Sequence, residues 1–180
     1  EVKWDGYRAV AEIREEGVSL YSRNLLSLEK RYPPVVNALR TLGFEAVLDG
    51  EIVVVDDAGR PDFQKLQHYR DSRGGRLLYC VFDLLHFAGR DLTGLPLVRR
   101  KEILKQILPS GSPIRFSDHV WKEGILFYGA ARKKGLEGIV AKHSRSAYEA
   151  GKRSRQWLKG KNLLTQEAVI AGFTAPGGGR

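Results

Sequence analysis

Cysteine is almost absent from this 180-residue chain, which contains Cys80 alone and no methionine. A single cysteine excludes a disulfide framework and any zinc site built from several cysteines. No apolar run approaches the roughly 18 residues of a membrane-spanning helix, so we expect no membrane partner. The chain starts at Glu1 without a signal-peptide pattern, so we expect an excised or processed piece of an intracellular protein.

Acidic residues are in deficit, with 21 Asp and Glu against 30 Lys and Arg and a net charge of +9. The excess is local, because residues 130–162 hold 10 basic and 2 acidic side chains. Such a window is either a solvated basic face or a phosphate-binding surface. Composition alone does not choose between the two.

Hydrophobic patterning predicts strands that alternate irregularly with helices. Alternation and β-branched runs predict strands over 7–13, 18–21, 46–55, 114–120, 136–142, 156–161 and 167–174. The apolar run 77–87 predicts a strand that is buried on both faces. Amphipathic spacing, prolines and caps predict helices over 33–42, 62–69, 96–108 and 122–134. The whole pattern indicates an α+β fold with largely antiparallel sheets.

Charged residues recur inside these predicted strands, where they are poor strand formers. Asp49 and Glu51 flank a glycine in one strand, and Asp83 interrupts the apolar run, where it needs a partner. Their repetition indicates that several strand faces converge on a polar site. We expect Asp5 to be a structural hydrogen-bonding residue and Trp157 to lie in the core.

Residues two apart on a strand share a face, so Lys159 and Lys161 should point the same way. Val140 and Lys142 should share a face as well, with Ile139 and Ala141 toward the core. Same-face lysines can neutralise a triphosphate, or they can protect an edge strand against aggregation. The residues themselves leave both readings open.

Six segments, in their order along the chain, resemble the motifs of the covalent nucleotidyltransferases, the polynucleotide ligases and mRNA capping enzymes. They are Lys3-x-Asp5-Gly6-x-Arg8, Ser22-Arg23-Asn24, Asp49-Gly50-Glu51, Phe82-Asp83, Glu137-Gly138-Ile139-Val140-x-Lys142 and Lys159-x-Lys161. The amino-acid sequences of segments 48–51, 60–63 and 154–159 are most similar to those of ATP-dependent DNA ligases. In particular they resemble the ligase domain of the bacterial end-joining ligase D type.

The resemblance implies a mechanism in which Lys3 attacks the α-phosphate of ATP to form lysyl-AMP and pyrophosphate. AMP then passes to the 5′-phosphate of a DNA nick, and the 3′-hydroxyl seals it. The implied nucleotide-binding residues are Glu1 at the adenine edge, Phe82 stacked on adenine, Arg8 and Arg23 at sugar or phosphate, and Glu51, Lys142, Lys159 and Lys161. The implied metal is Mg²⁺ or Mn²⁺, held by Glu51 and Glu137.

The remaining implications concern partners and domain limits. Nicked duplex DNA would be contacted through its phosphates by Arg132, Lys133, Lys134, Arg145, Lys152, Arg153 and Arg155. The family implies a nucleotidyltransferase domain over 1–163 and a truncated OB-fold beginning in 164–180, so we expect weak self-adenylation and poor or absent nick sealing. It further implies a Ku-type end-binding partner and a nucleoid-associated place in the bacterial cytoplasm.

Two other functions stay open at this point. An RNA ligase or an mRNA capping-type enzyme would use the same lysine chemistry on a different substrate. A non-catalytic nucleic-acid-binding module would use the basic window alone, and Lys3 would then have no special role.

Overall fold

The computed structural model describes residues 1–70, 74–111, 113–152 and 155–162. The strand predicted over 167–174, the proposed OB-fold start and Arg153 lie outside these residues. None of the described helices is both long and apolar enough to cross a bilayer.

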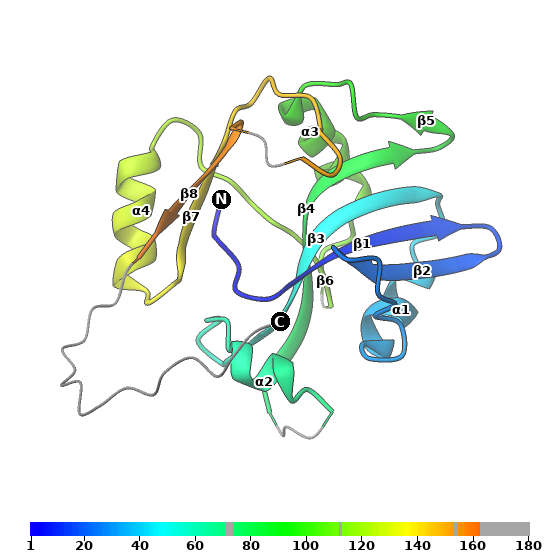
Figure 1. The fold of residues 1–180 in the computed structure, drawn as a ribbon, viewed down its shortest axis with the longest axis horizontal. Helices are drawn as coiled ribbons and strands as arrows, with labels where there is room; N and C mark the ends of the chain where they lie inside the picture. The colour runs from blue at the N-terminus through cyan, green and yellow to red at the C-terminus, as the bar shows by residue number, and fades with distance from the viewer. Residues whose placement is uncertain (71–73, 112, 153–154, 163–180) are drawn as a thin grey trace, which may run out of the picture.

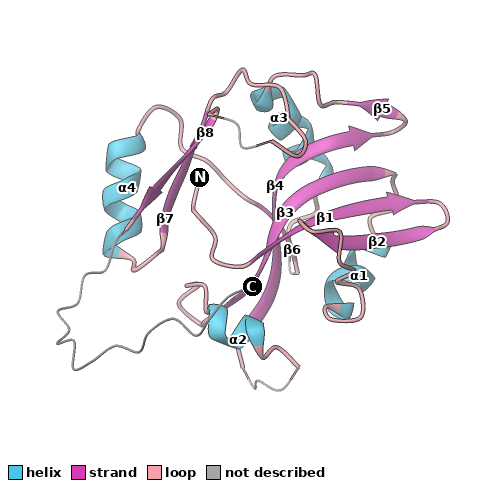
Figure 2. Cartoon of the chain, viewed as in Figure 1, coloured by secondary structure: helices cyan, strands magenta, loops and turns pink. Residues whose placement is uncertain are grey.

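The main sheet is built from one long antiparallel run of strands (Figures 1 and 2). Its members are β1 (Tyr7–Arg14), β2 (Gly17–Ser22), β3 (Ala46–Val55), β4 (Arg76–Phe87), β5 (Arg90–Asp91) and β6 (Ile114–Phe116). Their order is β2-β1-β3-β4-β5, and β6 pairs in parallel with β4. The central strands β3 and β4 therefore supply the positions nearest the middle of the molecule.

Apolar side chains cover both faces of the central strands. On one face, α1 (Pro33–Arg40), α2 (Phe63–Gln67) and α3 (Leu97–Ile107) bury Leu39, Leu66 and Leu104 in the main core. On the other face, Val53 and Val55 of β3 pack with Leu78 and Cys80 of β4 and with Trp4. This burial on both faces of β4 confirms the prediction that the apolar run 77–87 is a strand buried on both sides.

A second, two-stranded sheet stands apart from the first (Figure 1). Strands β7 (Gly138–Lys142) and β8 (Trp157–Lys161) pair antiparallel, and α4 (Gly124–Lys133) packs on β7. The first residues of the chain run along the free edge of β7, where the Val140 N–H donates to the Glu1 carbonyl (2.9 Å). The Lys3 N–H likewise donates to the Gly138 carbonyl (3.0 Å), so Lys3 lies at the junction between the sheets.

The α+β class with mostly antiparallel strands is confirmed. The strand predicted over 114–120 is too long, because the chain turns away at Ser117 after its N–H bonds the Val81 carbonyl (2.7 Å). The prediction that Ala141 faces the core is wrong. Ala141 is exposed, since two strands and one helix offer too little surface to bury both faces, while Ile139 is half-buried.

Candidate active site

Most of the predicted catalytic and nucleotide-binding residues line one pocket between the two sheets, of about 140 Å³, whereas Arg23, Glu137 and Lys161 do not. Its lining comes from the N-terminal segment, from β1, β3 and β4, and from β7 and β8: Glu1, Val2, Lys3, Trp4, Arg8, Glu51, Phe82, Val140, Lys142, Trp157 and Lys159. The fold therefore brings together residues that are far apart in sequence. The prediction that Trp157 is a core residue is wrong: it is half-buried and lines this pocket, and no residue of β8 belongs to the buried core of the described chain.

A larger hollow adjoins the pocket and shares Arg8, Trp157 and Lys159 with it. It also contains Arg23 and Lys161, together with Lys152 of the loop between β7 and β8. Lys159 and Lys161 line the same hollow, as their spacing predicts. The two hollows form a continuous positively charged depression that suits a polyphosphate.

The Nζ atom of Lys3 forms an ion pair with Glu137 Oε2, and Lys161 Nζ lies 3.8 Å from Oε1 of the same carboxylate. The Lys3 side chain is only 14% exposed, so it is held at the wall of the pocket rather than in solvent. An ammonium has no lone pair, so a reaction at Nζ first requires the loss of a proton.

Two glycines allow the backbone to pass close to a neighbouring strand at the site, Gly6 against β3 and Gly138 against β8. A Cβ at Gly6 would lie 2.1 Å from the Ile52 carbonyl oxygen, so only glycine lets the chain after Lys3 pass close to β3. Gly138 has φ +147°, and a Cβ there would lie 2.0 Å from the Gly160 oxygen. Each glycine directly follows a charged residue, Asp5 or Glu137, and so restricts where the backbone of that residue can lie.

Arg8 is held by a buried carboxylate of the neighbouring strand. Its Nε and Nη2 donate to Asp49 Oδ1 (3.0 Å) and Oδ2 (2.6 Å), a two-pronged geometry that only arginine offers. The hydroxyl of Tyr148 donates to Asp49 Oδ2 (2.9 Å) and accepts from Arg8 (3.3 Å). The β7–β8 loop is thereby fastened to the floor of the site, and Tyr148 is a site residue that the sequence did not reveal.

Glu51 lies beside Arg8 with its carboxylate withdrawn from solvent. Burial raises the pKa of Glu51 to about 8, although Arg8 and Lys3 act in the opposite direction. A carboxyl group in this state gains from a nearby cation, which would stabilise its charged form. Glu51 is therefore suited to a metal ion or to a hydroxyl donor.

A pair of aromatic rings lines the pocket. Phe82 and Trp157 meet edge to face with centroids 5.7 Å apart, and Lys142 Nζ lies 4.2 Å and 4.0 Å from the two centroids. Lys142 also lies 2.8 Å from Glu1 Oε2, while Lys101 of α3 lies 2.8 Å from Oε1. Burial raises the pKa of Glu1, but the two lysines more than offset it, and the net pKa is lowered.

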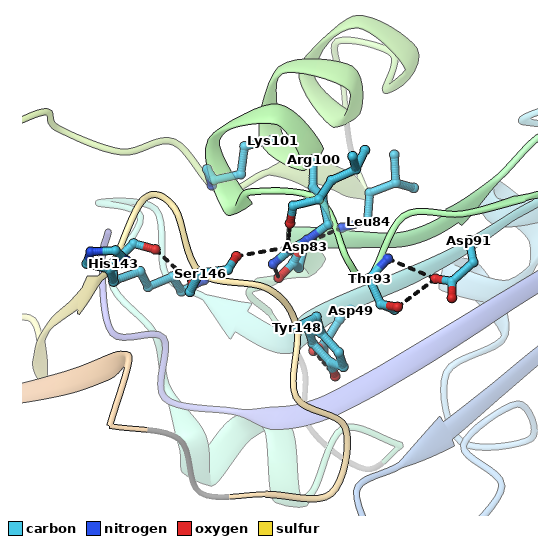
Figure 3. A network of polar contacts seen from close by, with 12 residues as sticks. Asp49, Asp83, Leu84, Asp91, Thr93, Arg100, Lys101, His143, Ser146 and Tyr148 are labelled. Carbon is cyan, nitrogen blue, oxygen red and sulfur yellow. Dashed lines mark hydrogen bonds and ion pairs between the residues drawn. The ribbon is translucent and has the colours of Figure 1, made fainter.

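Asp83 has its partner in α3, as Figure 3 shows. Arg100 Nε and Nη2 donate to the two oxygens of Asp83 at 2.7 Å and 2.9 Å, and its Nη1 donates to the carbonyls of Ser146 (3.1 Å) and Leu95. Sequence analysis predicted the apolar face of this helix but missed Arg100 and Lys101. A signal existed, since a carboxylate inside an apolar strand requires a buried cation on a packed element.

The candidate DNA-contacting cations fall into two groups at opposite ends of β7. Arg132, Lys133 and Lys134 are exposed at the end of α4, which precedes β7. Arg145, Lys152 and Arg155 are exposed in the loop that follows β7. The basic window of the sequence is thus two surface patches and one set of pocket-lining lysines.

Comparison with known proteins identifies the family. Residues 1–161 match the model of the ATP dependent DNA ligase domain. The chain belongs to this family. As a ligase domain it is 41% identical over 184 residues to the multifunctional non-homologous end joining protein LigD of Pseudomonas aeruginosa, covering 100% of this chain and 22% of that protein. It is 36% identical to the Mycobacterium tuberculosis LigD repair protein, covering 100% of this chain and 24% of that protein.

Solved structures agree with this assignment of the ligase domain. The ligase domain of M. tuberculosis LigD superposes with a TM-score of 0.79 at 33% identity, over 89% of this chain and 53% of that one. A mycobacterial DNA ligase D complexed with ATP and MES gives 0.81 at 33%, over 91% and 54%. The chain spans about a quarter of the length of these curated relatives.

Proposed function

We propose that this chain is the adenylating part of an ATP-dependent DNA ligase that acts in end-joining repair. The observation that carries the proposal is the convergence of Lys3, Glu51, Phe82, Lys142 and Lys159 on one pocket beside a cationic hollow. Relatives that are named as end-joining proteins support the biological setting.

The proposed chemistry proceeds in three displacements at phosphorus. Lys3 Nζ, as a neutral amine, attacks the α-phosphate of ATP, forming a P–N bond and expelling pyrophosphate. A 5′-phosphate oxygen at the nick then attacks the lysyl-AMP, which restores Lys3 and leaves AMP on the DNA end. Finally the 3′-hydroxyl attacks that 5′-phosphate, forming the phosphodiester bond and releasing AMP.

The roles of the other residues follow from their places in the pocket. Phe82 offers a ring face for adenine, with Glu1 at the base edge. Lys142, Lys159 and Lys161 supply positive charge for the phosphates, where charge builds up as pyrophosphate leaves. Arg8 and Arg23 lie in the adjoining hollow, where sugar or phosphate groups would extend.

The residues present fit a divalent cation that is held partly by substrate. Within the described chain no group of three or more carboxylate, histidine or cysteine side chains is gathered for a metal. The Glu137 carboxylate nevertheless already holds the Lys3 ammonium, so it is an acceptor for cations at this place, and burial raises the pKa of Glu51 to about 8, so a cation nearby would favour its charged form. Mg²⁺ commonly uses one or two carboxylates together with phosphates. Glu137 and Glu51 would hold Mg²⁺ or Mn²⁺, which would supply charge against the phosphates.

The DNA contacts complete the proposal. The exposed cations at the two ends of β7 would bind the phosphate backbone of nicked duplex DNA, with no base code. Within a longer protein of the relatives' kind, we propose that a Ku-type end-binding protein would bring this domain to broken DNA ends near the nucleoid. Residues 1–163 would form the nucleotidyltransferase domain, and 164–180 would lead into an OB-fold.

The deciding test is covalent labelling. Wild-type protein incubated with α-labelled ATP and Mg²⁺ should give a labelled band after denaturing electrophoresis, and Lys3→Ala should give none. Lys65→Ala, which changes an α2 lysine outside both hollows, is the matched control and should label like wild type. A band that survives Lys3→Ala would defeat the assignment of the nucleophile.

A further inference from the structure

The carboxylate of Glu1 is shared by two lysines in a buried cluster. Lys101 Nζ lies 2.8 Å from Oε1 and Lys142 Nζ lies 2.8 Å from Oε2, and the three side chains are only 4%, 5% and 6% exposed. Two ammonium groups against one carboxylate leave one positive charge in excess. Buried excess charge is unfavourable unless another anion arrives, so the cluster is prepared for a negatively charged ligand.

The two lysines differ in how firmly they are held. Lys101 Nζ also donates to the Ser117 carbonyl (2.7 Å) and lies 4.6 Å from the Phe116 ring centroid, and neither of these partners lines the pocket. Lys142 Nζ makes no hydrogen bond of good geometry within the described residues. It rests against the rings of Phe82 and Trp157 and lines the pocket. Lys101 is therefore the fixed partner of Glu1, and Lys142 is the movable one.

A nucleotide base cannot stack on the face of Phe82 that Lys142 covers while the ammonium lies 4.2 Å from the ring centroid. A base that binds on this pocket-lining face would therefore displace Lys142, and the phosphates of the same ligand would offer it new partners. Once Lys142 leaves, Glu1 would be a buried carboxylate without a counter-ion, unless another cation stays in place.

We infer that Lys101 is a positioning residue that keeps the Glu1 carboxylate paired and in place when a nucleoside triphosphate draws Lys142 away from Phe82. Lys101 belongs to none of the six motifs and does not itself reach the reacting atoms. The inference rests on the proposed adenylation function. It assigns to α3 a part in nucleotide affinity rather than in the chemical step.

The first test compares nucleotide binding with turnover. Lys101→Met should raise the dissociation constant for ATP by at least about 30-fold, the cost of removing one partner from a buried charge pair. The rate of lysyl-AMP formation at saturating ATP should change little. Lys101→Arg should recover part of the affinity. Lys105→Met is the control, because Lys105 lies 5.8 Å from the same Phe116 ring on the same helix but is exposed.

A double-variant comparison separates positioning from mere packing. In a Glu1→Gln background there is no carboxylate to hold, so Lys101→Met should then alter ATP affinity by less than about threefold. An equal loss in both backgrounds, or an unchanged dissociation constant in Lys101→Met, would overturn the inference. A wild-type protein without ATP binding or labelling would instead defeat the proposed function itself.

A structure of the wild-type protein with ATP tests the inference without any variant. It therefore decides the matter even when Lys101→Met does not fold. The expected result is Lys101 within hydrogen-bonding distance of Glu1 and Lys142 moved from the Phe82 ring to phosphate. Lys142 still on that ring, or Lys101 parted from Glu1, would overturn the inference.

Discussion

Two ion pairs of this protein each join a basic residue to a carboxylate far away in the sequence, and they differ in burial and in hydrogen bonding. Arg100 and Asp83 are both fully buried, joined by two hydrogen bonds, and the arginine is further tied to the Ser146 carbonyl. Lys3 and Glu137 are partly exposed, at 14% and 28%, and meet at the wall of an open pocket. The first pair is closed to solvent and ligand, and the second is open to both.

This difference in burial separates charges that stabilise the fold from charges that can take part in a reaction. A guanidinium stays charged and its planar fork matches a carboxylate, so Arg100 and Asp83 form a fixed joint between α3 and β4. An ammonium is a point charge that can lose its proton and change partners. Lys3 and Glu137 therefore suit a site in which the pairing must break before reaction.

The largest expected effect tests this contrast through stability. Arg100→Met should lower the free energy of unfolding by about 3–5 kcal/mol, because it leaves the Asp83 carboxylate buried and unpaired. Lys3→Met should cost about 1 kcal/mol or less, since the Glu137 side chain is 28% exposed and keeps Lys161 as a neighbouring cation. Urea unfolding of both variants measures the difference. Similar losses for the two would show that the pairs are not distinct in kind.

A smaller effect is expected at Tyr148, which lies between the closed and open regions. Tyr148→Phe removes the hydrogen bond to the Asp49 carboxylate and should cost about 1.5–3 kcal/mol, as is usual for a bond to a charged group. Urea unfolding is again the measurement, with Tyr128→Phe as the control. The control removes a hydroxyl bond to a neutral carbonyl, that of Lys161, and should cost less. The reverse order would place Tyr148 with the open region.

The pH dependence of stability tests the pairing of Glu1 with its two lysines. The pKa of Glu1 is lowered despite burial, because Lys142 and Lys101 lie beside its carboxylate. A carboxyl with a lowered pKa stabilises the fold above its unfolded pKa near 4.5, and this contribution is lost as the pH falls through the folded value. Wild type should therefore lose more stability than Glu1→Gln as the pH falls from 5 into more acidic solution. Thermal unfolding across this range measures it, and parallel curves would contradict the pairing.

Sequence reasoning predicted most of the fold and most of the pocket, and its failures share a physical cause. Periodicity predicted the central strands because their burial is set by neighbouring positions. The ordered motifs indicated that Lys3, Glu51 and Lys159 belong to one site, although only Glu51 and Lys159 lie in strands and Lys3 precedes β1. Arg100, Lys101 and Tyr148 were missed, since their partners lie on other elements and no local pattern records a contact across the fold.

The smallest expected effect concerns the two exposed patches at the ends of β7, which belong to the open region. Neutralising Arg132, Lys133 and Lys134 together, or Arg145, Lys152 and Arg155 together, removes three exposed cations in either case. Each lost phosphate contact should lower the slope of log affinity for nicked duplex against log salt by about 0.9. The loop patch borders the cationic hollow through Lys152, so its replacement should change the slope more. Fluorescence anisotropy at several salt concentrations measures both slopes. If the α4 set has the larger effect, DNA approaches from the end of β7 that lies away from the loop, and the hollow is reserved for the nucleotide.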